Sequence, residues 1–371
     1  MFENDPRTVM TLDAGGTNMV FSAIQGDRQV VAPIRLDAVN DDLDHCIDML
    51  KAGFEMVKSS LDTSPSAISF AFPGPADYPA GIIGDLPNFP AFRGGVPLGP
   101  ILEDLFHVPV FIENDGKLFA LGEATAGMLP RVNNALEAAG VRRSFHNLIG
   151  ITLGTGFGAG VVVDGHLLAG DNGCGGELWL SQNAKYPKLI AEESVSKRGV
   201  IRVYCERSGN SDTNFTPKDI FEIAEGKKAG DQAAAKASFE ELGRVAGVSI
   251  AHALDIIDGI VVIGGGIAGA SKYILPVICQ VLKENLGTIN GTQYRRVEME
   301  VFNWEDNSER SRFLNWSDRC VTSPVSGRGL AYHFARRTVV ALSQAGASLS
   351  IMKGAYSFAL LNLDKNHDDK P

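Results

Sequence analysis

Strands that run into glycine turns recur along this chain, and this recurrence constrains the possible folds more than any other feature of the sequence. Short apolar runs at residues 9–13, 148–153 and 260–263 each meet glycine within two residues. Such a turn lets backbone N–H groups converge on an anion, because no side chain stands in the way. Apolar residues at three- and four-residue steps over residues 43–57 predict an amphipathic helix after the first of these runs. The alternation predicts an α/β fold, and the repeated strand, glycine turn and strand predict two related halves.

The glycine turns indicate a binding site only when they are taken together as an ordered set. Glycine supplies 41 of the 371 residues, so a triplet such as 264–266 is expected by chance about 0.5 times in the chain. The sequence has neither a P-loop pattern nor a G-x-G-x-x-G that opens a helix after the first strand. The glycines at 154–158 are followed by another β-type run, which is wrong for a dinucleotide site at a helix N-terminus. P-loop and Rossmann sites are therefore disfavoured.

The first glycine loop holds groups that suit a metal-bound phosphate. Asp13 ends the first strand, and Thr17 follows Gly15 and Gly16. A carboxylate there can hold hydrated Mg²⁺, while the Thr17 hydroxyl and nearby amides can meet phosphate oxygens. The structural alternative is a plain hairpin with an Asx-type turn.

Length and composition narrow the class of protein. A chain of 371 residues is long enough for two domains with a sizeable core. The net charge is −10 and basic pairs such as Arg142-Arg143 are isolated, so we expect neither nucleic acid nor an anionic membrane as a partner. Scattered cysteines, the lack of a signal-peptide start and the lack of a long apolar run predict a cytoplasmic protein.

Four short segments, taken in their order and spacing, resemble one family. They are residues 13–17 (Asp-Ala-Gly-Gly-Thr), 113–116 (Glu-Asn-Asp-Gly), 154–156 (Gly-Thr-Gly) and 264–266 (Gly-Gly-Gly). Together they resemble the ROK family (repressors, open reading frames and kinases), and glucokinase-like sugar kinases are the nearest comparison. The resemblance implies the two-domain, actin-like ATPase fold, which is ribonuclease H-like, with ATP and sugar in an active-site cleft between the domains.

The resemblance also suggests how the chain is divided. We expect an N-terminal α/β domain at residues 1–125, joined by a C-terminal helix at about 350–371. The second α/β domain would comprise residues 126–349. The polar region near 290–320 is expected to be a surface excursion, because its tryptophans are embedded among charged residues.

Asp115 is the candidate catalytic base. Phosphoryl transfer to a hydroxyl needs the acceptor in line, the phosphate charge neutralised and a carboxylate to take the proton. Asp115 follows a short strand at 110–112 and precedes a helical pattern, and it matches the family's base. An Asp at such a corner is also a common helix N-cap, so this structural alternative stays open.

The other site residues come from the resemblance. The substrate-binding positions are Asn114, Glu177, Glu192, Asn88 and Gly74. The nucleotide-binding positions are Asp13, Gly15, Gly16, Thr17, Gly154, Thr155, Gly156, Gly264, Gly265 and Gly266, and Asp13 is also the expected Mg²⁺ ligand. The match at Glu192 can slip by one to Glu193. Each Asn or Gly could instead belong to an ordinary turn, and each Glu to a solvated surface.

The chain departs from the family in three places. The E-x-G-H element reads Glu177-Leu178-Trp179-Leu180, so Leu180 replaces the histidine and is expected to pack with Trp179. Residues 182–188 replace the cysteine-rich zinc element, and Cys174 alone cannot hold zinc, so no zinc site is expected. Lys117 replaces the second asparagine of N-D-A-N, with no evident consequence from sequence.

These observations favour an ATP- and Mg²⁺-dependent kinase that phosphorylates a hydroxyl, expected to be the 6-hydroxyl, of a free hexose such as glucose. One alternative is a sugar-responsive repressor, but a repressor would carry a helix-turn-helix before the first glycine loop, and twelve residues precede Asp13. Another is a sugar-binding protein without turnover, which the retention of Asp13 and Asp115 disfavours. The expected partners are sugar and ATP, and the resemblance implies a homodimer.

Overall fold

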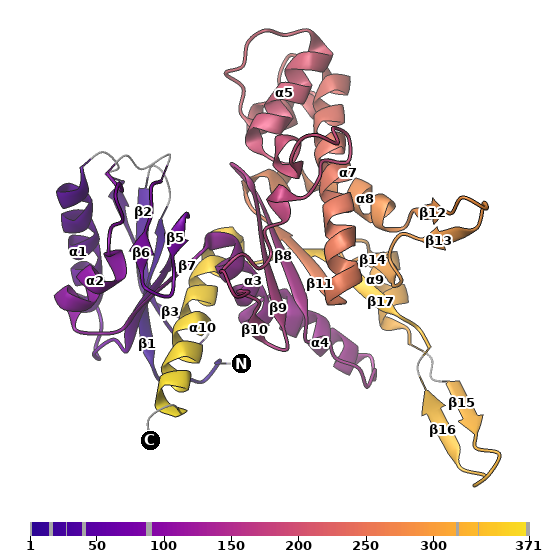
Figure 1. Ribbon diagram of the computed structural model, residues 1–371, viewed down its shortest axis with the longest axis horizontal. Coiled ribbons are helices and arrows are strands. Elements are labelled where there is room, and N and C mark those ends of the chain that lie inside the picture. Colours follow the sequence, from indigo (N-terminus) through magenta and orange to yellow (C-terminus); the bar gives the residue numbers. More distant parts are fainter. Residues whose placement is uncertain are drawn as a thin grey trace. The chain divides into compact units, whose positions relative to one another are not determined.

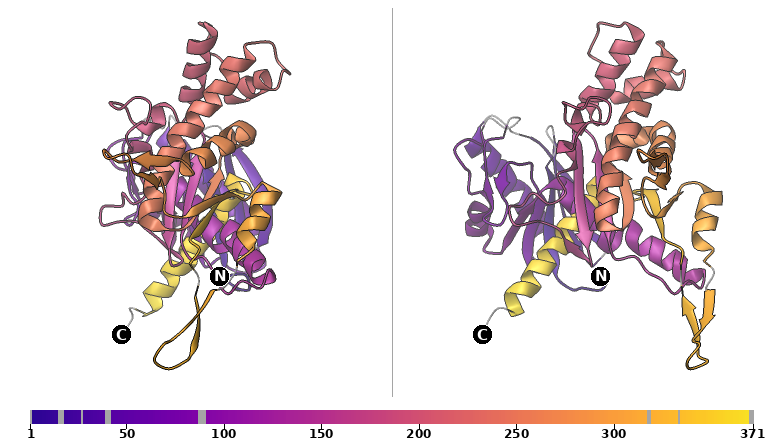
Figure 2. Two further views of the ribbon diagram at one scale, coloured as in Figure 1. Left: turned by 90° about the vertical axis from the view of Figure 1, so that its right-hand side faces the viewer. Right: turned by 45° about the vertical axis from the view of Figure 1, so that its right-hand side comes forward.

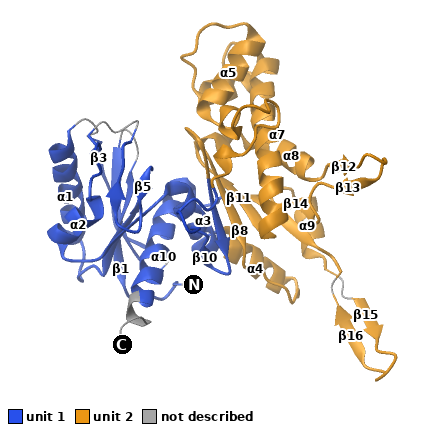
Figure 3. Ribbon diagram, viewed as in Figure 1, with its two compact units in different colours: residues 1–127, 159–176, 343–371 blue, residues 128–158, 177–342 orange. Residues whose placement is uncertain are grey.

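The computed structural model describes residues 2–14, 18–26, 28–38, 42–86, 91–316, 319–332 and 334–368. The chain forms two compact units (Figure 3). Unit 1 comprises Met1–Gly127, Ala159–Gly176 and Ser343–Pro371, and unit 2 comprises Met128–Gly158 and Glu177–Leu342. Residues 159–176 thus cluster with unit 1, whereas the division expected from sequence assigned them to the second domain.

A five-stranded sheet forms the centre of unit 1, in the order β3-β2-β1-β4-β7 (Figure 1). β1 and β2 pair as the predicted antiparallel hairpin, and β1, β4 and β7 run parallel. In this register Asp13 pairs with Ala71, and Ala71 pairs with Glu113, so the three parallel strands end side by side. The strands are β1 (Thr8–Ala14), β2 (Asn18–Gln25), β3 (Arg28–Asp37), β4 (Ala67–Ala71) and β7 (Val110–Glu113), with a small pair formed by β5 (Ala76–Asp77) and β6 (Ile82–Ile83).

Helices cover both faces of this sheet. Successive strand residues point to opposite faces, so neighbouring residues of one strand pack against different helices. Met10 and Leu12 pack with α1 (Leu43–Ser59) and α2 (Leu98–Phe106), whereas Val9 packs with α10 (Ala347–Asp368). Figure 1 shows α1 and α2 on one side of the sheet and α10 on the other. The predicted helical face over residues 43–57 is confirmed, with Phe54 fully buried.

Two glycines allow α10 to lie directly against α3 (Asp115–Ala126). A Cβ on Gly122 would lie 1.9 Å from the carbonyl oxygen of Ser350, and a Cβ on Gly354 would lie 1.8 Å from that of Leu118. Neither approach is possible for a larger residue without moving the backbone. The helix that carries the candidate base is therefore fixed by direct backbone packing within unit 1.

The second sheet has six strands in the order β10-β9-β8-β11-β17-β14. β8, β11, β17 and β14 are parallel along its length. The strands are β8 (Leu148–Leu153), β9 (Phe157–Val163), β10 (His166–Leu167), β11 (Ile260–Gly264), β14 (Glu300–Asn303) and β17 (Arg337–Leu342). Two short pairs are formed by β12 (Asn285–Gly287) with β13 (Gln293–Arg295) and by β15 (Arg319–Thr322) with β16 (Gly329–Tyr332).

In unit 2 the 26-residue α7 lies beside α8 and also packs against α5 and α6 (Figures 1 and 2). The α-helices are α4 (Met128–Ala138), α5 (Lys197–Ser208), α6 (Pro217–Ala224), α7 (Gln232–Ile257), α8 (Ser271–Leu282) and α9 (Asn307–Leu314). The 3₁₀ turns are η1 (Leu178–Leu180), η2 (Ala191–Glu193) and η3 (Gly266–Ala270). The helix expected from residue 267 onward thus begins as the 3₁₀ turn η3. None of the helices in the described ranges combines the length and hydrophobicity that a bilayer-spanning segment requires.

The polar stretch around residue 310 differs from the expected surface excursion. It contains α9, whose Phe313 is fully buried, and Trp304 is 8% exposed. The ring centroids of Phe302, Trp304 and Trp316 lie 5.7, 6.1 and 6.3 Å from that of Phe313. Two adjacent apolar residues, Phe313 and Leu314, in an otherwise polar helix produce no period that sequence reading can detect, so only the fold reveals this aromatic cluster.

Candidate active site

The parallel strands of unit 1 bring several predicted site residues to one edge of the sheet. Asp13 lies near the end of β1, Gly74 follows β4, and Asn114 and Asp115 follow β7. Because these strands are adjacent and parallel, their carboxyl ends meet at the same edge, where α/β proteins commonly bind ligands. Gly15, Gly16, Thr17 and Asn88, also predicted here, lie outside the described residues.

Asp13 keeps a partly exposed carboxylate at this edge. The hydroxyl of Ser348, on α10, donates a hydrogen bond of 2.5 Å to Asp13 Oδ2. A single carboxylate fits Mg²⁺, which binds through one or two carboxylates and takes its other ligands from water and phosphate oxygens. Asp13 could therefore hold the metal of a metal–nucleotide substrate.

The turn between β7 and α3 shows which residue caps the helix and which is the candidate base, a choice that the sequence left open. Asn114 is the N-cap of α3, because its Oδ1 accepts hydrogen bonds from Gly116 N (2.9 Å) and Lys117 N (3.3 Å). The alternative in which Asp115 is the cap is therefore wrong. Asp115 is the first residue of α3, and its side chain is exposed while Oδ1 accepts from Gly116 N at 2.8 Å. Within the described ranges, Asn114 Nδ2 has no hydrogen-bond partner.

Lys117 is a residue whose role sequence reasoning missed. Its side chain is 2% exposed, and its Nζ lies 3.6 Å from Glu113 Oε1 and donates to the Gly173 carbonyl oxygen at 2.5 Å. Glu113 Oε1 also accepts from Asn114 N at 2.9 Å. Lys117 thus connects the turn that carries Asp115 to the loop that precedes residue 177. The Gly173 contact spans 56 residues, so no local signal could have indicated it.

Two glycine loops lie next to each other in unit 2. They follow β8 and β11, which are adjacent parallel strands, with Thr152 opposite Gly264. Gly265 has a φ of +94°, and a Cβ there would lie 2.4 Å from the Leu153 carbonyl oxygen, so only glycine fits. A Cβ on Gly154 or Gly266 would have nothing within 4 Å. This open, adjacent backbone suits the phosphates of a nucleotide.

Glu192 lies against the first of these loops. Its Oε2 accepts a hydrogen bond of 3.0 Å from Phe157 N, and a Cβ on Gly156 would lie 2.4 Å from that oxygen. Its Oε1 pairs with Arg198 at 3.0 Å. Glu193, the alternative match, also pairs with Arg198, at 2.8 Å.

Glu177 is exposed and precedes the 3₁₀ turn η1 in unit 2, in which Leu178 and Trp179 are half-buried. Trp179 Nε1 donates a hydrogen bond to Glu177 Oε2. Leu180 is 53% exposed, so the expected packing with Trp179 covers less than half of it. Successive side chains of a 3₁₀ helix point about 120° apart, so Trp179 and Leu180 cannot cover the same surface.

No three His, Cys, Asp or Glu side chains among the described residues are grouped as a metal site would require. Cys174 is exposed, and its Sγ contacts the Asn172 carbonyl oxygen at 3.4 Å. The expected lack of zinc remains a prediction that metal analysis can test.

Comparison with known proteins defines the class. The fold is that of the actin-like ATPases, with glycine loops and carboxylates at the ends of parallel strands. The chain belongs to the ROK family, which it matches over residues 9–305.

Three relatives illustrate the similarity. A glucokinase from Parabacteroides distasonis is 52% identical, with a TM-score of 0.85 over 97% of this chain and 99% of that one. An N-acetyl-D-glucosamine kinase from Photobacterium profundum is 27% identical over 274 residues, 69% of this chain and 83% of that protein. A ROK hexokinase from Thermus thermophilus, 20% identical with a TM-score of 0.67, covers 96% of this chain and 99% of its own, and shows the shared fold.

Proposed function

We propose that this ATP-dependent sugar kinase transfers the terminal phosphoryl group of Mg-ATP to the 6-hydroxyl of a free hexose, with glucose as the first candidate. Similarity to a glucokinase, at 52% identity over 97% of the chain, supports the substrate class. N-acetyl-D-glucosamine is the second candidate, because a kinase for that sugar is 27% identical over 69% of the chain.

One observation carries the assignment of the base: Asn114 caps α3 and leaves the Asp115 carboxylate exposed at its first residue. In the proposed reaction Asp115 accepts the proton of the sugar hydroxyl as its oxygen attacks the γ-phosphorus. The new oxygen–phosphorus bond forms while the bond to the β-phosphate oxygen breaks, and ADP leaves. Asp115 then releases its proton to solvent.

Asp13 and the glycine loops have the proposed role of holding Mg-ATP. Asp13 is a carboxylate of the kind that Mg²⁺ prefers, and the bound ion would neutralise the charge of the phosphate oxygens. The backbone at Gly154–Gly156 and Gly264–Gly266 has room for phosphate oxygens, as the open space beside Gly154 and Gly266 indicates. Gly15, Gly16 and Thr17 are proposed for the same task from the family pattern.

Sugar binding is proposed for Asn114, Glu177, Glu192, Gly74 and Asn88. Asn114 supports this role, because its capping oxygen is used and its Nδ2 can donate to a hydroxyl. Glu192 can accept further hydrogen bonds, since a carboxylate has about four acceptor positions and, in the part of the chain that the structure describes, this one accepts from Phe157 and Arg198.

A coupled assay of ADP release over a panel of hexoses tests the proposal. The panel would contain glucose, mannose, N-acetylglucosamine and N-acetylmannosamine, with Asp115→Asn as the inactive control. We expect turnover with at least one of them, and NMR of the product should place phosphate on carbon 6. Sugar binding without turnover would favour a regulatory or non-catalytic protein instead.

A further inference from the structure

A buried carboxylate in unit 2, outside the residues proposed above, accepts hydrogen bonds from three side chains. Glu241, on α7, has a side chain that is 5% exposed. It accepts hydrogen bonds from Lys185 Nζ, from Ser194 Oγ at 3.0 Å and from Arg202 Nη2 at 3.1 Å. Burial opposes the charge of Glu241, but the hydrogen bonds from Lys185, Ser194 and Arg202 outweigh it and hold its pKa below the ordinary value. The carboxylate is therefore ionised at neutral pH.

Hydrogen bonds between buried polar groups also help to hold the conformation of residues 181–196. Its buried apolar residues are Ala191 and Val195, whereas its buried polar residues include Asn183 and Ser194. Asn183 is fully buried, accepts hydrogen bonds from the backbone N–H groups of the two turn residues 185 and 186, and donates to Ser194 Oγ at 3.0 Å. Since apolar burial in the segment is small, Glu241 and this network hold its conformation together with backbone hydrogen bonds such as that from Ala191 N to the Ser181 carbonyl oxygen at 2.8 Å.

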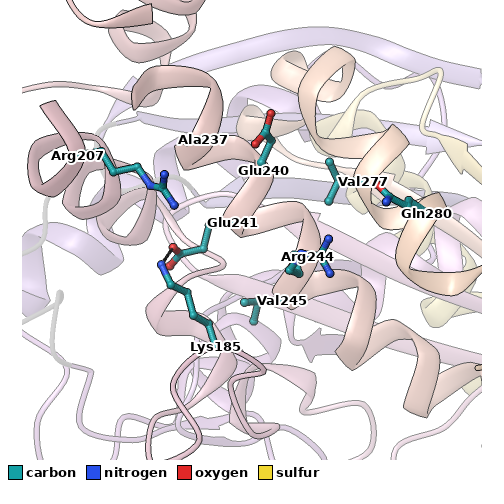
Figure 4. A pocket seen from close by; sticks show the side chains of 9 residues that line it. All are labelled: Lys185, Arg207, Ala237, Glu240, Glu241, Arg244, Val245, Val277 and Gln280. Carbon is teal, nitrogen blue, oxygen red and sulfur yellow. Dashed lines mark hydrogen bonds and ion pairs between the residues drawn. The ribbon is translucent and has the colours of Figure 1, made fainter. Parts of the chain in front are cut away.

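A cavity of about 450 Å³ borders the network (Figure 4). Lys185 and Glu241 point toward each other at its wall, while the Glu240 carboxylate points away from them. On this side Glu241 therefore borders a cavity rather than closely packed side chains.

The same segment carries Glu192 to the first glycine loop. Ser196 Oγ donates to the Glu192 carbonyl oxygen at 2.7 Å, and Lys197 N donates to the Gly154 carbonyl oxygen at 3.0 Å. Arg202, which bonds to Glu241, also reaches the carbonyl oxygen of Glu193. A continuous set of hydrogen bonds thus joins Glu241 to the residues that flank Glu192.

We propose that Glu241 is a positioning residue for substrate binding, whose carboxylate holds residues 181–196 in the conformation that presents Glu192 beside Gly156. This inference rests on the proposed function, because it takes Glu192 as a sugar ligand. Removing the charge of Glu241 leaves Lys185 and Arg202 without their shared anionic partner, and it loosens the segment. Sugar affinity falls as a result, whereas proton transfer at Asp115 is not affected.

The experiment compares Glu241→Gln with Glu240→Gln. Glu240 is the matched control, since it is the preceding residue of α7, is exposed and borders the same cavity. We expect Glu241→Gln to raise KM for the sugar about tenfold and to change kcat less than about threefold. Hydrogen exchange at the amides of residues 183–196 should be faster by about tenfold, because local opening becomes easier. Glu240→Gln should leave both quantities unchanged.

A second variant keeps the test decisive if Glu241→Gln does not fold. Ser194→Ala removes one of the three donors to Glu241. This variant should also raise KM for the sugar and speed hydrogen exchange at residues 183–196, each by a smaller factor. Unchanged exchange, or faster exchange with an unchanged KM for the sugar, would overturn the inference. A wild-type protein that phosphorylates none of the sugars would instead refute the proposed function, and hydrogen exchange would still decide whether Glu241 organises the segment.

Discussion

The ammonium group of Lys117 lies 3.6 Å from the carboxylate of Glu113, and the two side chains are 2% and 7% exposed. Glu113 and Lys117 are four residues apart in the sequence, and Asn114 and Asp115 lie between them. The candidate base is therefore carried on a turn that a buried ion pair braces, with the Gly173 carbonyl oxygen as a further partner of Lys117.

Replacing Lys117 by Met should destabilise the protein markedly. Removing one partner of a buried ion pair costs about 3–5 kcal/mol, because the other charge stays buried. Urea denaturation would measure the loss. The double variant Lys117→Met with Glu113→Gln should recover part of it, and Lys51→Met, at an exposed lysine of α1, should change stability by less than about 0.5 kcal/mol. Equal effects at Lys117 and Lys51 would contradict this reading.

Asp115→Asn should lower kcat by about 10²–10⁴-fold, the usual contribution of a general base, because the amide cannot take the proton. KM for the sugar should change little, since size and hydrogen bonding are largely kept. Steady-state kinetics would measure both. Asp104→Asn, at an exposed acid of α2, is the matched control and should keep full activity. An Asp115 variant with more than half of the wild-type kcat would show that another group is the base.

Asp13→Ala should abolish most turnover while sugar affinity stays close to wild type. The reason is that a carboxylate at this position serves the metal and phosphates rather than the sugar, and loss of such charge stabilisation costs about 10²-fold or more in rate. Calorimetric titration with sugar in the absence of nucleotide would measure the affinity. A collapse of sugar binding in a folded Asp13 variant would make the metal role untenable.

The first glycine loop offers a paired test. A Cβ on Gly156 would lie 2.4 Å from Glu192 Oε2, whereas a Cβ on Gly154 would meet nothing within 4 Å. Gly156→Ala should therefore displace the Glu192 carboxylate and raise KM for the sugar about tenfold, equivalent to about 1.4 kcal/mol. Gly154→Ala should leave sugar affinity unchanged and weaken ATP binding. Identical effects of the two variants on the sugar would argue against a role for Glu192.

Zinc removal should have no effect on this protein. A structural zinc site needs about four Cys or His ligands, and between residues 170 and 204 the sequence offers Cys174 alone. Elemental analysis should find well under one zinc per chain, and a chelator should leave the melting temperature unchanged. Stoichiometric zinc, or unfolding on chelation, would overturn this expectation.

Local patterns were enough to predict much of the architecture. The apolar spacing over residues 43–57 predicted α1, and the apolar runs before glycine predicted β8 and β11, because each pattern reflects burial within one element. The glycines at 154–156 and 264–266 were recognisable as turns because glycine interrupts each of these apolar runs. Their adjacency follows from the parallel pairing of β8 with β11, which the sequence does not state.

Only the tertiary structure decided how side chains far apart in the chain are paired. The sequence by itself located the corner at residues 113–116, but the fold decided that Asn114 caps the helix and that Lys117 reaches Gly173. It also decided that Glu241 accepts from Lys185 and that Phe313 is buried. A periodic pattern reports which face of one element is apolar, whereas a polar pairing across 56 residues depends on where the whole fold brings each side chain.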